Sequence, residues 1–90
     1  MSNVAVGGWS PFAPLDKEAK LAFDTAISGL LGVEYTPVAY SSQIVNGTNY
    51  NFLCQATPVY PGAVSYSAHV YVYQPLQGPA HITQITPVVH

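Results

Sequence analysis

The 90-residue chain is poor in charge, since only 7% of its residues are Asp, Glu, Lys or Arg, against about 25% in ordinary soluble domains. Lys17 and Lys20 are its only cations, it has no Arg, and its formal net charge is −2. A surface that binds nucleic acid needs clustered Lys or Arg to neutralise phosphates. The sequence therefore argues against a nucleic-acid partner, and it predicts weak long-range attraction of any partner.

The chain is also poor in cysteine and in long apolar runs. Cys54 is the only cysteine, so no internal disulfide can form. No stretch approaches the roughly 20 apolar residues that cross a bilayer, which predicts no membrane partner. The first eight residues carry no positive region and no long apolar core, unlike a secretory signal. These features favour a cytoplasmic, reducing environment, unless the chain is a trimmed mature form.

Clusters that would hold a metal or catalyse a reaction are missing as well. His69, His81 and His90 lack metal-ligand spacing and have no Cys or carboxylate cluster beside them, so no cofactor is expected. Cys54 with one of these histidines would suggest a thiol hydrolase. Cys54 falls on an apolar strand face, however, where a small buried hydrophobe is the commoner role. We therefore expect no enzymatic activity.

The N-terminal third of the chain predicts an extended arm followed by one helix, within a single domain covering 1–90. Residues 1–14 are rich in Gly, Pro and small side chains and form the expected arm. Apolar residues at three- and four-residue spacing predict a helix at about 16–31, with Asp16 as N-cap and Gly32 as terminator. The apolar stripe consists of Ala19, Ala22, Phe23, Ala26, Ile27, Leu30 and Leu31.

From Val33 onward the apolar residues recur with a period of two, which predicts strands. Three strands have a clear apolar face, and a short last strand is expected near 81–86. The faces comprise Val38, Tyr40, Ser42 and Ile44, then Tyr50, Phe52, Cys54 and Ala56, then Val64, Tyr66, Ala68, Val70 and Val72. One α-helix packed on a four- or five-stranded antiparallel sheet is an α+β fold.

The run from Gln43 to Tyr50 is expected to form the tip of the first hairpin. Its Asn-Gly pair usually signals a two-residue turn, but that register would mix polar and apolar residues on one face. An odd-length loop centred on 46–48 keeps the faces separate, because register follows the buried face. That loop pairs Ile44 with Tyr50, Ser42 with Phe52, Tyr40 with Cys54 and Val38 with Ala56, and turns Gln43, Val45 and Asn49 away from the helix.

The same run contains the pattern Gln-x-Val-x-Gly, and two other segments accompany it. Val6-Gly7-Gly8 in the arm places an apolar residue before glycine, and the expected second hairpin carries Pro75-Leu76. In this order the three segments resemble the cystatin family of cysteine-protease inhibitors. The continuation Thr48-Asn49-Tyr50 resembles the intracellular branch, the stefins. The resemblance extends from Val6 to about Thr86.

The resemblance implies a cystatin-like fold and a reversible, tight-binding inhibitor of papain-like cysteine proteases. The arm and two hairpin loops would enter the active-site cleft without offering a cleavable peptide bond. The implied protease-binding residues are Val6, Gly7, Gly8, Gln43, Ile44, Val45, Asn46, Gly47, Pro75 and Leu76. Asn46 replaces a small Ala common in the family, and no Trp stands at the position of Leu76. A non-inhibitory cystatin-like protein-binding module is therefore the alternative.

The remaining alternatives concern the tip and self-association. Residues 43–47 could be an ordinary hairpin turn whose Asn and Gly supply positive φ. Asn46-Gly47-Thr48 is a glycosylation sequon, and a glycan there would obstruct docking. Either the protein is intracellular and unglycosylated, or the sequon argues against protease inhibition. A monomer is expected, although uncharged strands and a hairpin that can open also permit a strand-exchanged dimer.

Overall fold

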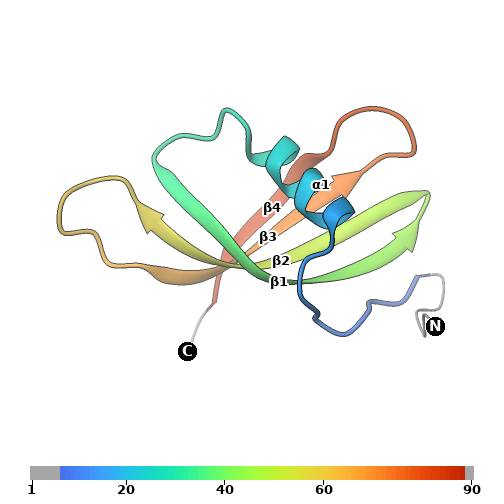
Figure 1. Ribbon diagram of the computed structural model, residues 1–90, viewed down its shortest axis with the longest axis horizontal. Coiled ribbons are helices and arrows are strands. Elements are labelled where there is room, and N and C mark those ends of the chain that lie inside the picture. The colour runs from blue at the N-terminus through green and yellow to red at the C-terminus, as the bar shows by residue number, and fades with distance from the viewer. Residues whose placement is uncertain (1–6, 89–90) are drawn as a thin grey trace.

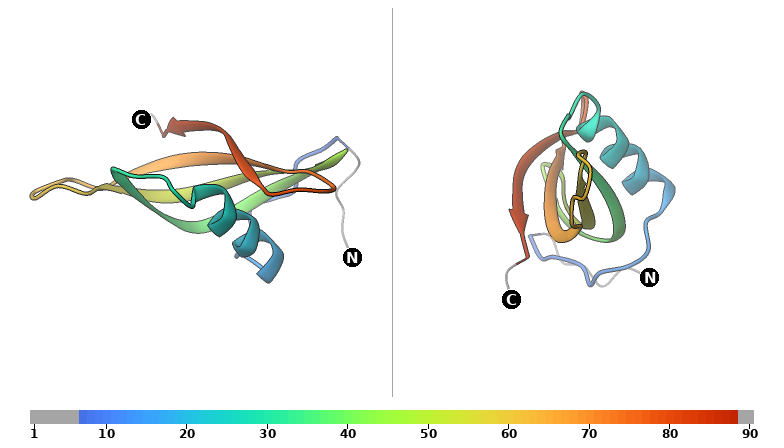
Figure 2. Two further views of the ribbon diagram at one scale, coloured as in Figure 1. Left: turned by 90° about the horizontal axis from the view of Figure 1, so that it is seen from above. Right: turned by 90° about the vertical axis from the view of Figure 1, so that its left-hand side faces the viewer.

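The protein folds as one helix packed on a four-stranded antiparallel sheet, the predicted α+β arrangement, which is consistent with a cystatin-like fold. The computed structural model describes residues 7–88, so Val6 of the expected site lies outside the described residues. The elements are α1 (Lys17–Ile27), β1 (Val33–Val45), β2 (Gly47–Pro58), β3 (Tyr66–Gln74) and β4 (His81–Pro87). The strands pair in chain order, and the twisted sheet curves around α1 (Figures 1 and 2).

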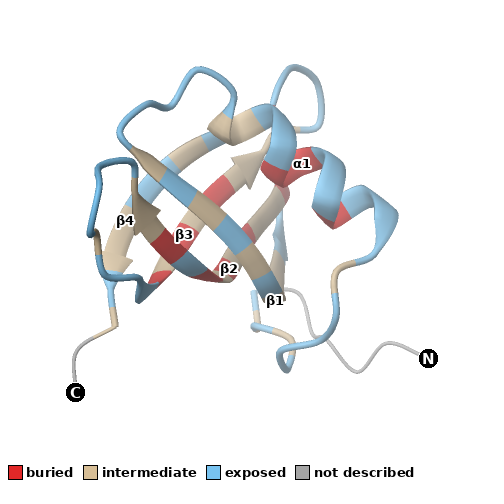
Figure 3. Ribbon diagram, turned by 60° about the vertical axis from the view of Figure 1, so that its left-hand side comes forward, coloured by how far each residue is buried: buried red, intermediate tan, exposed pale blue. Residues whose placement is uncertain are grey.

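The core lies between α1 and the face of the sheet that is turned toward it (Figure 3). The rings of Phe23 and Phe52 meet edge to face with their centroids 4.9 Å apart, a favoured aromatic geometry. The predicted apolar faces of β2 and β3 are therefore the buried ones. The buried core residues are Ala19, Ala22, Phe23, Tyr50, Phe52, Cys54, Val70, Val72 and Ala80.

The helix begins as expected and ends early. Asp16 caps it, because Oδ1 of Asp16 accepts a 2.8 Å hydrogen bond from the Ala19 amide. Its last residue is Ile27, since Gly29 adopts a left-handed φ of +86° and ends the helix before Gly32 can. Leu30 and Leu31 are consequently exposed, and their assignment to the buried stripe was wrong.

The first hairpin has an odd-length turn, as predicted. Its strands, however, pair in a register that differs from the predicted one by two residues. Ile44 pairs with Thr48 and Ser42 with Tyr50, so the turn is centred on Asn46 alone. The predicted pairs were therefore wrong, although the faces were right. A shift of two residues leaves every side chain on the same face, so the apolar pattern could not distinguish the two registers.

The predicted burial of apolar residues was also wrong at one position in β1 and near the start of β3. A bulge between Pro37 and Ala39 leaves Val38 unpaired and 60% exposed. Pro37 lacks the N–H that regular pairing needs, which is why bulges accommodate proline. Val64 lies before β3 and Tyr66 is its first residue, and both are exposed, so their assignment to the buried face was wrong.

Candidate functional site

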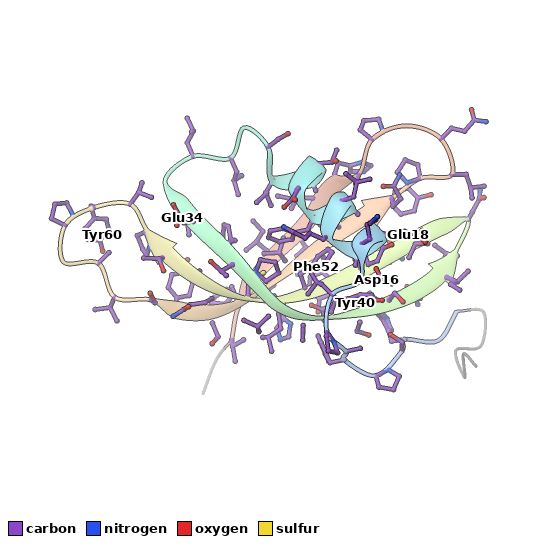
Figure 4. All side chains as sticks on the ribbon, in the orientation of Figure 1. Asp16, Glu18, Glu34, Tyr40, Phe52 and Tyr60 are labelled. Atoms are coloured by element: carbon purple, nitrogen blue, oxygen red, sulfur yellow. The ribbon has the colours of Figure 1, made fainter. Side chains whose placement is uncertain are left out.

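The arm, the first hairpin and the β3–β4 connection reach the same end of the elongated molecule (Figures 1 and 2). We call this end the loop end. It contains every described residue of the expected site: Gly7, Gly8, Gln43, Ile44, Val45, Asn46, Gly47, Pro75 and Leu76. The β2–β3 connection, which carries Tyr60, lies at the opposite end (Figure 4). Antiparallel pairing in chain order produces this arrangement, because alternate connections fall at opposite ends of the sheet.

The tip of the first hairpin is exposed and tightly turned. Val45 pairs with Gly47, which leaves Asn46 alone at the apex. Ile44 and Val45 are 46% and 39% exposed, so the hairpin presents two apolar side chains beside a neutral amide. Gly47 has a φ of +105° and is buried. A Cβ at this position would lie 2.5 Å from the carbonyl oxygen of Gln74, so the turn requires glycine here.

A second contact joins the tip to β3. The Tyr73 hydroxyl donates a hydrogen bond to the carbonyl oxygen of Asn46. Because β3 also leads into the second hairpin, Tyr73 couples both loops. No sequence pattern indicates this role, since Tyr73 is one of several tyrosines on the strands and the bond spans 27 positions along the chain.

The arm is fastened along the outer edge of β1. The Gly7 amide donates to the Ile44 carbonyl at 3.1 Å, and Nε2 of Gln43 donates to the Gly7 carbonyl at 2.8 Å. Nδ2 of Asn49 in turn donates to Oε1 of Gln43 at 2.9 Å. The Gln43 side chain therefore connects the arm to β2. Gly8 is half-buried behind this connection.

Further along, the arm behaves as a partial fifth strand. Trp9 and Ala13 form isolated bridges with Gln43 and Tyr40. Ser10 exchanges bonds with Ser42, its amide donating at 2.8 Å and its hydroxyl accepting at 2.9 Å. These contacts fix the direction in which Gly7 and Gly8 approach the loop end.

The β3–β4 connection is closed by one side chain. Nε2 of Gln74 donates to the carbonyls of Pro75 and Gly78 at 3.1 and 3.0 Å. Pro75 is half-buried, whereas Leu76 is 76% exposed and projects as an apolar contact.

None of the residues that define the loop end is charged, since the two lysines and four acids all fall between Asp16 and Glu34. Cys54 is buried in the core, and burial raises the pKa of its thiol from 9.0 to about 12, so it carries no reactive thiolate at neutral pH. Among residues 7–88, no three His, Cys, Asp or Glu side chains come close enough to hold a metal. In the same range, no helix is long and apolar enough to cross a membrane.

No protein-family model and no curated protein matches the chain. The resemblance to cystatins therefore consists of the three sequence motifs and a fold that is consistent with that of the family.

Proposed function

We propose that the protein inhibits papain-like cysteine proteases by inserting the loop end into their active-site cleft. The observation that carries the proposal is the convergence of the three motif segments, which are far apart in sequence, at one uncharged end of the molecule. An ordinary hairpin turn at 43–47 would not require the arm and the second hairpin to accompany it.

The loop end is suited to a cleft because its parts are held before binding. Gln43 fastens the arm, Tyr73 fastens the first hairpin and Gln74 closes the second. A preformed surface loses little conformational entropy on association, so more of the contact energy appears as affinity. Full burial of an exposed aliphatic side chain contributes about 1.5–3 kcal/mol, so Leu76, which is 76% exposed, would contribute most of that amount in the protease and Val45, which is 39% exposed, less than half of it.

The same bonds explain how the inhibitor would resist cleavage. A papain-like protease must bring an extended peptide bond against its catalytic thiol. In the first hairpin, Asn46 is flanked by paired strands, and its carbonyl oxygen is held by Tyr73. Extending this segment would break strand pairing as well as that bond.

The proposed role requires an unmodified tip and therefore favours the cytoplasm. Asn46 is exposed and belongs to a glycosylation sequon, so a glycan would stand between the loop end and the cleft. The single, unpaired Cys54 is also compatible with a reducing compartment.

Titration of papain tests the proposal. We expect stoichiometric inhibition at micromolar concentration, and we expect Val45→Asp to weaken it by about tenfold or more, because the carboxylate would lose water in the cleft. Val59→Asp, at an exposed position on the β2–β3 connection, is the matched control and should inhibit like the parent. Gly7→Glu and a chain lacking residues 1–6 should inhibit less well. A folded parent that leaves papain fully active at micromolar concentration contradicts the proposal.

A cystatin-like module that binds another protein through the same end is the second candidate. The polar Asn46 at the apex and the absence of an aromatic anchor at Leu76 favour it. In that case papain stays active, while a partner captured by the parent is not captured by Val45→Asp.

A further inference from the structure

A small pocket lies apart from the tips of the two hairpins, where the arm folds over the sheet. It measures about 180 Å³ and is lined by Trp9, Asn49, Tyr50, Tyr71, Thr83 and Gln84. Tyr71 stands opposite Asn51 on β2 and opposite Gln84 on β4. This row lies on the face of the sheet turned away from α1, since the residues that alternate with it form the core. We propose that this pocket binds one ring of a neutral sugar.

Two aromatic rings form adjoining walls of the pocket. Trp9 and Tyr71 meet edge to face, with centroids 6.2 Å apart and planes at 82°. Sugar rings present C–H groups that pack on the electron-rich face of such rings. A flat nucleobase would instead favour two parallel walls that sandwich it, and this pocket has none. The two nearly perpendicular walls therefore suit a puckered sugar ring, which is thicker than a flat base and carries hydroxyl groups around its edge.

The remaining lining groups are polar and neutral. Asn49 donates through Nδ2 to Gln43, which orients its amide and leaves Oδ1 as an acceptor. The side chains of Thr83 and Gln84 are exposed to solvent. Their hydrogen bonds to water can therefore be replaced by hydrogen bonds to a ligand at little cost in free energy. An amide and a hydroxyl together can donate to and accept from neighbouring sugar hydroxyls. No charged residue lines the pocket, so it lacks the charge-assisted hydrogen bonds that favour a phosphate or carboxylate ligand.

A β-bulge builds one side of the pocket. Tyr71 pairs with Gln84 and Val72 with Ile82, which leaves Thr83 as an extra residue in β4. In a regular strand, consecutive residues point to opposite faces. Thr83 and Gln84, at this bulge, both line the pocket. Bulges are over-represented beside functional sites, where they re-aim side chains.

The volume limits the ligand to one ring. Pockets for drug-sized ligands measure roughly 300–1,000 Å³, and this one is smaller. We therefore expect affinities in the roughly millimolar range for monosaccharides, with further contacts needed for tighter binding. This inference does not depend on the proposed protease inhibition.

Titration of the ¹⁵N-labelled protein with methyl glycosides of glucose, galactose, mannose and N-acetylglucosamine tests the inference. We expect at least one to cause saturable shifts at the Trp9 indole, the Asn49 amide, Thr83 and Gln84. Gln84→Ala should weaken that binding by about three- to tenfold, which is the loss of one hydrogen bond. Trp9→Ala should abolish it, and Tyr60→Ala, at the opposite end, should leave it unchanged.

Trp9→Ala could weaken binding simply by disturbing the arm. Gln84→Ala avoids this problem, because the Gln84 side chain is exposed and its loss should leave the fold intact. The inference is overturned if no glycoside gives saturable shifts up to roughly 100 mM. It is also overturned if Gln84→Ala binds like the parent, or if adenosine binds more tightly than every sugar.

Discussion

At the scale of single residues, the loop end depends on a few side chains that bond across the sheet. Gln43 joins the arm to β2, and Tyr73 joins the first hairpin to β3. Gly47 allows the closest approach, since its backbone lies against the carbonyl oxygen of Gln74. Each of these residues acts through geometry, so its replacement should change stability even where no partner is present.

Gly47→Ala should lower the free energy of unfolding by about 2 kcal/mol, because it adds a Cβ against backbone and strains a φ of +105°. Urea unfolding followed by circular dichroism measures the loss. Gly62→Ala is the control, since Gly62 has a similar φ of +79° but open space around its Cβ position. Equal losses in the two variants would show that the contact with Gln74 is unimportant.

At the scale of the elements, α1 is attached to the sheet through its first turn. The Asp16 carboxylate accepts from the Ala19 amide with one oxygen and, at 3.0 Å, from the Tyr40 hydroxyl with the other (Figure 4). The pKa of Tyr40 is raised, mainly because the side chain is partly buried and secondly because of this hydrogen bond. One side chain thus caps the helix and fixes its position on β1.

Asp16→Ala should reduce the free energy of unfolding by about 1–2 kcal/mol, because it removes an N-cap as well as the bond to Tyr40. Asp16→Asn should lose less, since Asn is also a good N-cap. Asp24→Ala removes only an exposed ion pair with Lys20 and should change stability by less than about 1 kcal/mol. Thermal unfolding of the three variants separates these contributions. A loss for Asp24→Ala that matches Asp16→Ala would count against the capping role.

The sequence predicted the elements better than their boundaries and contacts. Periodicity identified the helix and the buried strand faces because burial repeats along the chain. It extended the helix to Leu31, because it gave no weight to Gly29 as an earlier terminator. The motifs located the loop end, but the bonds from Gln43 and Tyr73 span 36 and 27 positions, and no local pattern encodes them. The register of the first hairpin was missed for another reason, since a shift of two residues leaves the alternation of apolar and polar residues unchanged.

At the scale of the whole molecule, the buried thiol and three buried or partly buried tyrosines make the free energy of unfolding depend on pH in the alkaline range. Burial raises the pKa of Cys54 from 9.0 to about 12. It also raises the pKa values of Tyr35, Tyr40 and Tyr50 above 10.0. Above pH 9 the unfolded chain releases the thiol proton while the folded chain keeps it. The contribution to stability is therefore complete below pH 9 and is lost as pH rises toward 12.

Between pH 9 and 10 the thiol should be the largest single contributor to this loss, with a slope of its own that approaches about 1.4 kcal/mol per pH unit as an order-of-magnitude limit, and the three tyrosines add to the loss as pH nears 10. Cys54→Ala should flatten the curve in this window, although the variant is less stable at every pH because of the cavity. Urea midpoints at pH 7, 8, 9 and 10 provide the comparison. A parallel decline in parent and variant would assign the effect to other groups.

The two outer edges of the sheet are protected unequally, which predicts how the molecule associates. Within residues 7–88, no segment pairs with the outer edge of β4, which ends at Pro87, whereas the arm covers the outer edge of β1. The arm satisfies the carbonyls of Tyr40, Ser42 and Ile44. Without it, β1 would present unpaired backbone groups and few charges, the features that promote pairing between sheet edges.

A chain that lacks residues 1–14 should therefore form dimers or larger species, while the parent stays monomeric over the same range of concentrations. Size-exclusion chromatography with light scattering at several concentrations measures this difference. A chain that lacks only residues 1–6 is the control, because it keeps the bonds from Gly7, Ser10 and Ala13 to β1. If the longer deletion stays monomeric and folded, the arm serves the loop end alone. If the shorter deletion associates equally, the backbone contacts of Gly7 to Ala13 are insufficient to protect the edge.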